Sequence, residues 1–220
     1  MSRRLFIAGA HTDVGKTYAA CAILRAARAA GQSVQALKPV VSGFDLANWE
    51  GSDPGRLLSA LGRSLTVAEL DAVSPLRFGA ALSPPMAARL EGVDLRLAQL
   101  ERFCRDGLAA SGADLTVVEG VGGVMSPIAE DATCLDLMIT LGLPSVLVGG
   151  SYLGGVSHTL TAVETLRGRG LSIEAVVVSQ DGAADAPDFD QTLEAVARFA
   201  PGLKVIAARR GDEGWARTLV

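Results

Sequence analysis

Residues 9–17 read Gly-Ala-His-Thr-Asp-Val-Gly-Lys-Thr, and this segment is the most informative motif for the fold of the chain. It stands between a short apolar run, Leu5–Ala8, and a stretch rich in Ala, Leu and Arg, Thr17–Ala30, that has no internal Gly or Pro. The pattern predicts a buried strand, a glycine loop and a helix, the arrangement in which backbone N–H groups at a helix start face a phosphate. The spacing between Gly9 and Gly15 is one residue longer than in the standard motif, but the Gly-Lys-Thr ending in this setting still predicts nucleotide binding.

The last three residues of this loop have chemistry suited to a nucleotide. Gly15 lets the backbone approach a phosphate, Lys16 reaches the β and γ phosphates, and the Thr17 hydroxyl is placed for Mg²⁺. Lys16 is also one of only three lysines among the 20 basic residues, the others being Lys38 and Lys204. A lysine in so lysine-poor a chain needs a specific reason, and phosphate binding supplies one.

Further short apolar runs alternate with helical patterns along the whole chain. Because the runs are continuous rather than alternating, they predict strands buried on both faces of a parallel sheet. The expected fold is therefore α/β: one doubly wound, mainly parallel sheet in a single P-loop NTPase domain that covers residues 1–220. The expected strands are Leu5–Ala8, Ser33–Lys38, Leu115–Val118, Ser145–Val148, Ile173–Ser179 and Leu203–Ala207, and the expected helices are Thr17–Ala30, Asp53–Ala60, Pro84–Leu90, Leu95–Ala110, Cys134–Leu141, Val156–Arg167 and Phe189–Phe199.

Charged residues follow or close further strands, and ligands bind at the carboxyl ends of strands in such sheets. Lys38 ends a strand that we expect beside the first, so that its ammonium group projects near the loop and holds an anionic reacting group; taken alone, a surface position explains it equally well. Glu119 ends a buried strand in the turn Glu119–Gly123 and suits Mg²⁺, held directly or through water. Asp53 precedes Pro54 at a helix start, where an N-cap role explains it without any ligand.

A second helix start with glycines follows the strand Ser145–Val148. The segment Leu153-Gly154-Gly155-Val156-Ser157-His158 offers free N–H groups suited to a carboxylate, although an ordinary turn explains it equally well. We expect His158 to be a packing residue inside this helix. His11 lies in the phosphate loop, and no acid–base step is assigned to it.

Composition argues against several other classes of protein. A hydrophobic content of 49% excludes a disordered chain, and a net charge of −4 with 5% aromatics argues against nucleic-acid binding. The longest later apolar stretch, 141–150, is broken by Pro144 and is too short to span a membrane. Cys21, Cys104 and Cys134 form no CxxC pair, which predicts neither a zinc site nor disulfides and favours a reducing, cytoplasmic location.

Taken together, these motifs resemble the dethiobiotin synthetase family, the ATP-dependent ring-closing ligases of biotin biosynthesis. The resemblance runs in the same order along nearly the whole chain. It is carried by the ordered set His11–Thr17, Lys38–Gly43, Ser52-Asp53, Phe78–Ala87, Val118–Gly120 and Leu153-Gly154 followed by His158.

The resemblance implies a reaction and its ligands. The family joins CO₂ to one amine of 7,8-diaminononanoate as a carbamate. ATP phosphorylates the carbamate to a carbamic-phosphoric anhydride, and the second amine closes the ureido ring with release of phosphate. The resemblance also implies Mg²⁺ as cofactor, ATP as co-substrate and a homodimer, with no role for nucleic acid or a membrane.

Residue by residue, the resemblance implies the following roles. Lys16 and Lys38 are the implied catalytic residues. Thr17, Asp53 and Glu119 would hold Mg²⁺, which gives Asp53 a role beyond an N-cap. The implied ATP contacts are Asp13, Val14, Gly15, Lys16, Thr17, Tyr18, Asp53, Glu119, Gly120, Val121, Gly122, Gln180 and Asp181, and the implied substrate contacts are Thr12, Lys38, Ser42, Leu153, Gly154, Gly155, Val156 and Ser157, the last five across the dimer interface.

Several positions depart from the family pattern. His11 stands in place of the usual Asp, Pro85 in place of a His, and Tyr152 where a basic residue is frequent. Gln180-Asp181 replaces Asn-Asp, and Lys204–Ala207 replaces Gly-x-Ile-Pro. The last two departures fall at the family's adenine contacts, which predicts relaxed selectivity for the base.

Two alternatives share the plan of loop and sheet. A regulatory ATPase switch of the chromosome-partitioning or septum-positioning kind would carry KGGxGKT, whereas His11, Thr12 and Asp13 occupy the first three positions here, and no amphipathic membrane-targeting tail follows Gly211. An amidotransferase-type cobyrinate synthase needs an additional glutaminase domain, for which we expect no room in 220 residues.

Overall fold

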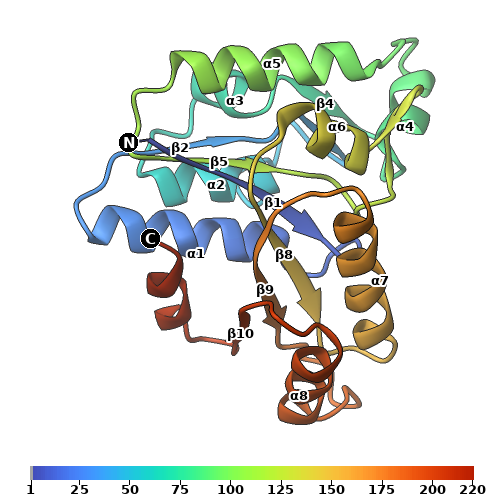
Figure 1. Ribbon diagram of the computed structural model, residues 1–220. Helices are drawn as coiled ribbons and strands as arrows, with labels where there is room; N and C mark the ends of the chain where they lie inside the picture. Colours follow the sequence, from blue (N-terminus) through green and yellow to red (C-terminus); the bar gives the residue numbers. More distant parts are fainter. Residues whose placement is uncertain (1) are drawn as a thin grey trace.

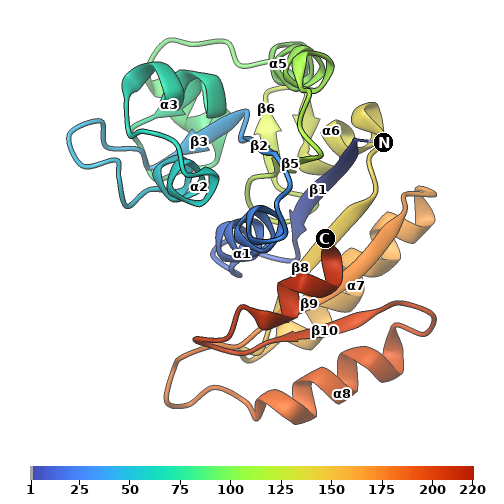
Figure 2. The same ribbon diagram turned by 90° about the vertical axis from the view of Figure 1, so that its left-hand side faces the viewer.

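The computed structural model describes residues 2–220 and is built around a parallel sheet of six strands in the order β10-β9-β8-β1-β5-β2 (Figures 1 and 2). All five neighbouring pairs in this sheet are parallel. The expected α/β fold with a mainly parallel sheet is thereby confirmed. The strands are β1 (Arg3–Gly9), β2 (Val34–Leu37), β5 (Leu115–Glu119), β8 (Ser145–Gly150), β9 (Ile173–Ser179) and β10 (Val205–Ala208).

Helices cover both faces of the sheet, because successive side chains of each strand point in opposite directions. Along β1, Leu5 and Ile7 join a core cluster with α1, α2 and η1, while Phe6 and Ala8 join a second cluster with α4 to α8. Figure 1 shows α1 on one side of the sheet and α5 on the other. The helices are α1 (Lys16–Ala29), α2 (Asp53–Leu61), α3 (Val67–Val73), α4 (Pro84–Leu90), α5 (Leu97–Ala110), α6 (Cys134–Leu141), α7 (Gly155–Gly168), α8 (Phe189–Phe199) and the 3-10 helix η1 (Gly214–Leu219).

Strand β1 lies at the point where the strand order reverses. It pairs with β5 on one side and with β8 on the other, so the loop that follows Gly9 opens into the crevice where open α/β sheets bind ligands. The expectation that the strand of Lys38 lies beside the first strand is wrong, because β2 pairs with β5 and β5 separates it from β1. Glu119 therefore stands at the end of the strand between the two lysines.

Several short elements were not predicted. β3 (Val40–Ser42) pairs with β4 (Leu76–Phe78), and β6 (Pro127–Ala129) pairs with β7 (Ala132–Thr133). With α2 and α3, β3 lies beyond the β2 edge of the main sheet (Figure 2). Strands of two or three residues are too short for a periodic pattern, which explains why their sequences gave no signal.

The C-terminal 3-10 helix η1 packs against α1. Trp215 is buried, its ring lies 6.3 Å from the ring of Tyr18, and the Tyr18 hydroxyl donates to the carbonyl of Asp212. This contact ties the end of the chain to the helix that begins at the phosphate loop.

The three cysteines are buried and free. Burial raises the pKa of Cys21 and of Cys104 to about 12 and that of Cys134 to about 11. Among residues 2–220, no helix has both the length and the apolar character to cross a membrane.

Candidate active site

The loop between β1 and α1 adopts the close-packed form that its glycines predict. A Cβ on Gly9 would lie 2.8 Å from Cδ of Lys16 and 3.0 Å from the carbonyl oxygen of Gly122. Gly15 has a φ of +98°, in the left-handed region that favours glycine, and the backbone of Asp13 is left-handed as well. The Lys16 ammonium folds back over the loop and donates to the carbonyl of His11 at 3.2 Å. This backbone is the cradle in which a phosphate would sit.

A charged cluster lies behind the loop at the carboxyl ends of β2 and β5. The ammonium group of Lys38 lies 2.7 Å from Oε1 of Glu119 and 3.3 Å from Oδ2 of Asp53. The Thr17 hydroxyl donates to the same oxygen of Glu119 at 2.6 Å. Lys38 and Glu119 are almost fully buried, whereas the Asp53 side chain is 42% exposed. Four of the predicted residues are therefore in direct contact.

Burial and neighbouring charges shift the pKa values of Lys38, Lys16 and Asp53. Burial alone would lower the pKa of Lys38, but the carboxylates of Glu119 and Asp53 outweigh it, and the pKa lies above the ordinary 10.5. Burial, and then the charge of Lys38, lower the pKa of Lys16. Burial would raise the pKa of Asp53, but Lys38 and Thr17 hold it below its usual value. An incoming phosphate would relieve the repulsion between the two ammonium groups.

The oxygen atoms of Thr17, Asp53 and Glu119 suit Mg²⁺, which keeps water ligands, better than a metal ion that protein side chains bind entirely. Residues 2–220 contain no group of three or more His, Cys, Asp or Glu side chains that could hold a metal ion. Mg²⁺ usually takes one or two carboxylates and completes its octahedron with water and phosphate oxygens. Oε2 of Glu119 is buried and has no hydrogen-bond partner within the described part of the chain, so it has free capacity for such an ion or for its bound water.

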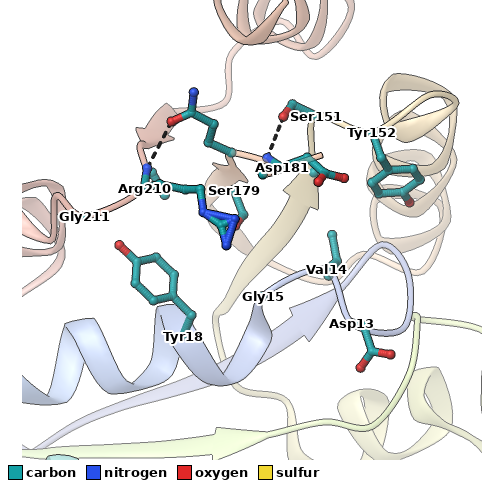
Figure 3. Close-up of a pocket in the computed structure, with 14 residues that line it drawn as sticks. Asp13, Val14, Gly15, Tyr18, Ser151, Tyr152, Ser179, Asp181, Arg210 and Gly211 are labelled. Carbon is teal, nitrogen blue, oxygen red and sulfur yellow. Dashed lines mark hydrogen bonds between the residues drawn. The ribbon is translucent and has the colours of Figure 1, made fainter. Parts of the chain in front are cut away.

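A cavity of about 470 Å³ extends from the loop along the ends of β8, β9 and β10 (Figure 3). Oε1 of Gln180 accepts a hydrogen bond from the backbone N–H of Arg210, and the backbone N–H of Asp181 donates to Ser151 Oγ. The predicted ATP contacts that line this cavity are Asp13, Val14, Gly15, Tyr18, Gln180 and Asp181.

Several residues of this cavity were missed by sequence reasoning. Ser151, Tyr152, Ser179 and Arg210 also line it, and Figure 3 shows the Arg210 side chain reaching toward Ser179. Ser151, Ser179 and Arg210 stand at or just after the ends of β8, β9 and β10. The rule that ligands bind at carboxyl ends of parallel strands could have found them.

A second cavity of about 410 Å³ lies on the other side of the loop. Three segments line it: the loop at Ala10–Thr12, the turn Gly123–Pro127, and α7 from His158 to Thr165. Thr12 is thus the predicted substrate contact that faces this cavity.

The remaining predicted residues do not line either cavity. Gly120, Val121 and Gly122 follow directly after β5 and line neither cavity. A Cβ on Gly122 would meet Ser126 Oγ at 2.3 Å. Ser42 is half-buried on β3, outside both cavities. Leu153 and Gly154 precede α7, and Gly155–Ser157 form its first turn. Leu153 is 89% exposed, and Gly155 packs so closely that a Cβ would lie 2.1 Å from the carbonyl oxygen of Gly150.

Comparison with protein families gives a match over most of the chain. Residues 3–208 match a family model described as an AAA domain. The chain is 57% identical to the ATP-dependent dethiobiotin synthetase BioD of Phenylobacterium zucineum (strain HLK1), covering 98% of this chain and 93% of the relative. It is 52% identical to the protein of the same name from Caulobacter vibrioides (strain NA1000 / CB15N), covering 99% and 97%.

Solved structures show the same fold at low sequence identity. The MinC:MinD cell division protein complex of Aquifex aeolicus aligns with a TM-score of 0.55 and 9% identity over 99% of this chain and 86% of that chain. The hydrogenase maturation factor HypB of Archaeoglobus fulgidus aligns with a TM-score of 0.53 and 16% identity over 99% and 88%. Both likenesses concern the fold alone.

Proposed function

The chain belongs to the family of ATP-dependent dethiobiotin synthetases, and on this premise we propose how its residues divide the work of an ATP-dependent ligase of biotin biosynthesis. The substrates in this proposal are 7,8-diaminononanoate, CO₂ and ATP. The observation that carries the proposal is the contact of Lys38, Glu119 and Thr17 directly behind the phosphate loop. One lysine lies at the start of α1 and the other just after β2, and this pair suits a reaction in which two anions, the γ-phosphate and a carbamate, must be brought together.

ATP takes the loop and the first cavity in this proposal. The backbone N–H groups of the loop and the Lys16 ammonium hold the phosphates, and the base enters the cavity beside Tyr18, Gln180 and Asp181. Mg²⁺, held by Thr17, Asp53 and Glu119, would neutralise charge on the phosphate oxygens. The free oxygen of Glu119 supports this assignment.

Lys38 holds the carbamate against the γ-phosphate, together with Thr12 and Ser42. A compact ammonium group, buried and already charged, offers a fixed positive charge where negative charge gathers as the phosphoryl group moves. The reaction then requires positioning and charge stabilisation rather than an enzyme nucleophile, since the carbamate itself attacks phosphorus.

The substrate carboxylate binds at the start of α7 in this proposal. The N–H group of Gly155 already donates to the carbonyl of Tyr152, which leaves those of Val156 and Ser157 at the start of the 14-residue helix for a carboxylate. The exposed Leu153 supports a homodimer in which this helix start meets the partner subunit. We also propose that residues 1–220 act as a single P-loop domain and that the protein works in the cytoplasm, a location supported by its free, buried cysteines.

The direct test is phosphate release from ATP, measured with and without 7,8-diaminononanoate and bicarbonate. We expect release to depend on both, with dethiobiotin formed in equal amount and identified by mass spectrometry. ATP turnover that is indifferent to the diamine would favour the alternative of a regulatory ATPase and refute the ligase.

Lys38→Ala tests the carbamate role. We expect it to abolish ring closure while ATP affinity, measured by titration calorimetry, falls by less than about tenfold, because the loop and Lys16 remain. Lys204→Ala is the matched control: although Lys204 begins the segment that replaces Gly-x-Ile-Pro, it is exposed, lines neither cavity and donates to the carbonyl of Thr218, so activity should be unchanged. An equal loss of ATP binding and ring closure in Lys38→Ala would show that Lys38 belongs to the nucleotide site instead.

A further inference from the structure

The two histidines of the chain lie against each other beside the phosphate loop. His11 comes from the loop and His158 from α7, and their rings stack with centroids 5.2 Å apart and planes 7° from parallel. Tyr152, just before α7, packs on both rings at 5.8 and 5.7 Å. Its hydroxyl group lies 2.7 Å from Nδ1 of His158. The expectation that His158 is only a packing residue is therefore incomplete, because it is exposed and holds the ring of His11.

These histidines are the titratable side chains of the second cavity. The lining described for this cavity contains no Asp, Glu, Lys, Arg, Cys or Tyr. Its other side chains are hydroxyl-bearing or apolar, such as Thr12, Val124 and Met125. A proton that leaves a group bound in this cavity therefore has an imidazole as its nearest protein acceptor.

The hydrogen bond of His11 decides which ring nitrogen can accept that proton. Nδ1 of His11 lies 2.8 Å from the carbonyl oxygen of Thr12. A carbonyl only accepts, so Nδ1 must carry a hydrogen, and in the neutral ring the lone pair then belongs to Nε2. Burial raises the pKa of Tyr152, so its phenol keeps its hydrogen and can donate to His158.

The reaction of the proposed function needs such an acceptor. Aliphatic amines resemble the lysine side chain and are protonated near neutral pH, whereas only the neutral amine has the lone pair for nucleophilic attack. Imidazole is the side chain best suited to exchange protons in this pH range. Carboxylates and amines of the protein are absent from the described lining, so among the side chains that line this cavity an imidazole is the best acceptor.

We propose that His11 accepts the proton that the ring-closing amine of the substrate must lose, with His158 and Tyr152 holding its ring in place; this inference rests on the proposed function. The substrate ammonium gives one proton to Nε2 of His11, leaving a neutral amine and an imidazolium. The amine lone pair forms the C–N bond to the carbonyl carbon of the phosphorylated carbamate. The C–O bond to phosphate breaks, phosphate leaves with the bonding pair, and the second N–H proton of the attacking nitrogen passes to the phosphate.

The charged and titratable groups around His11 come from two of the segments that surround it. The loop contributes Asp13 next in sequence and Lys16, whose ammonium contacts the His11 carbonyl. The segment before and within α7 contributes Tyr152 and His158, and the turn at Gly123–Pro127 contributes no charged group. Two positive charges on rings whose centroids are 5.2 Å apart would repel each other.

His11→Asn tests the proposal, because asparagine can keep an N–H donor near Thr12 but has no equivalent of Nε2. We expect kcat for diamine-dependent phosphate release to fall about 100-fold at pH 7, within the range of general base catalysis. The loss should shrink to a few fold by about pH 9.5, where more of the substrate amine is already neutral. ATP affinity should stay within twofold, and added imidazole should restore part of the rate in His11→Gly.

His158→Asn separates the acceptor from the residue that positions it. We expect a smaller loss in this variant with the pH dependence of the wild type, since His11 remains. A loss in His11→Asn that is constant across pH, or no loss, would overturn the proposal. So would a pH-dependent loss seen only in His158→Asn. Failure of the proposed function is distinguishable, because the wild type would then show no diamine-dependent release at any pH, and the inference would fall with it.

Discussion

Replacement of Lys38 by methionine tests whether the buried charge cluster holds the fold together as well as the site. The ammonium group lies 2.7 Å from Oε1 of Glu119, and both side chains are at most 2% exposed. With an effective dielectric constant of about 20, the attraction across this distance is roughly 6 kcal/mol. Part of it is offset by the cost of burying the ammonium, which methionine does not bear.

The net change in the free energy of unfolding depends on the Glu119 carboxylate, which loses its charged partner in Lys38→Met. Glu119 stays buried with only the Thr17 hydroxyl on Oε1, and removal of one partner of a buried pair typically costs about 3–5 kcal/mol. Asp53 adds less, because its side chain is half-exposed and water screens it. We therefore expect Lys38→Met to lower the free energy of unfolding by about 3–5 kcal/mol near pH 7.

The assay is urea denaturation of the nucleotide-free protein, with Lys204→Met as the exposed control. The folded-state pKa of Lys38 is raised, so its contribution is fully present below pH 10.5 and is lost only as the pH rises through the folded-state pKa. The double variant Lys38→Met with Glu119→Gln removes both charges and should recover most of the loss. A loss below about 1 kcal/mol, or a double variant that loses the sum of the two single variants, would refute the reasoning.

Three further predictions concern other parts of the molecule. Gly155→Ala should destabilise the protein by more than about 2 kcal/mol, because its Cβ would lie 2.1 Å from a backbone carbonyl oxygen. Gly168→Ala, at the other end of α7, is the control: its Cβ meets nothing within 4 Å, so thermal unfolding of this variant should show a neutral or slightly stabilising effect. The oxygen of the Gln180 amide is already bonded to the Arg210 backbone, so its NH₂ group is left for the base, and we expect GTP to support turnover within about tenfold of ATP in a phosphate-release assay; a gap of about 10⁴ would contradict this. Burial raises the pKa of Cys21, Cys104 and Cys134, so a thiol reagent at pH 8 should label the folded protein slowly and the urea-unfolded protein fully. Rapid labelling of the folded protein would contradict the burial of these cysteines.

The positions of several candidate site residues could be predicted because one rule applies to every parallel strand. Lys38 and Glu119 were identified from their positions at strand ends, and both are found at one edge of the sheet. The rule needs only the strand and its polarity, and continuous apolar runs supply both. It does not depend on which strands are neighbours, and so the wrong expectation for β2 did not displace Lys38 from the site.

The parts that were not predictable depend on contacts between distant segments. The local sequence around His11 does not predict a contact with His158, nor the reverse, because the two rings stack only when α7 lies beside the loop. The hydrogen bond from the Arg210 backbone to Gln180 depends in the same way on the pairing of β9 with β10. The order of strands is likewise set by how whole layers pack, which no single segment encodes.

The position of β1 has a consequence for synthesis of the chain on the ribosome. Arg3 pairs with Leu115, Phe6 with Ser145, and the first cavity is closed by residues as late as Gly211. The loop at residues 9–17 thus emerges first, before the strands that flank it. Pairings so distant in sequence form slowly and leave an exposed strand edge meanwhile. A ligand stabilises only the state that binds it, so ATP can protect nascent chains only after translation has reached the last strand. Chains that stop earlier gain nothing from it and are the ones we expect chaperones and proteases to meet.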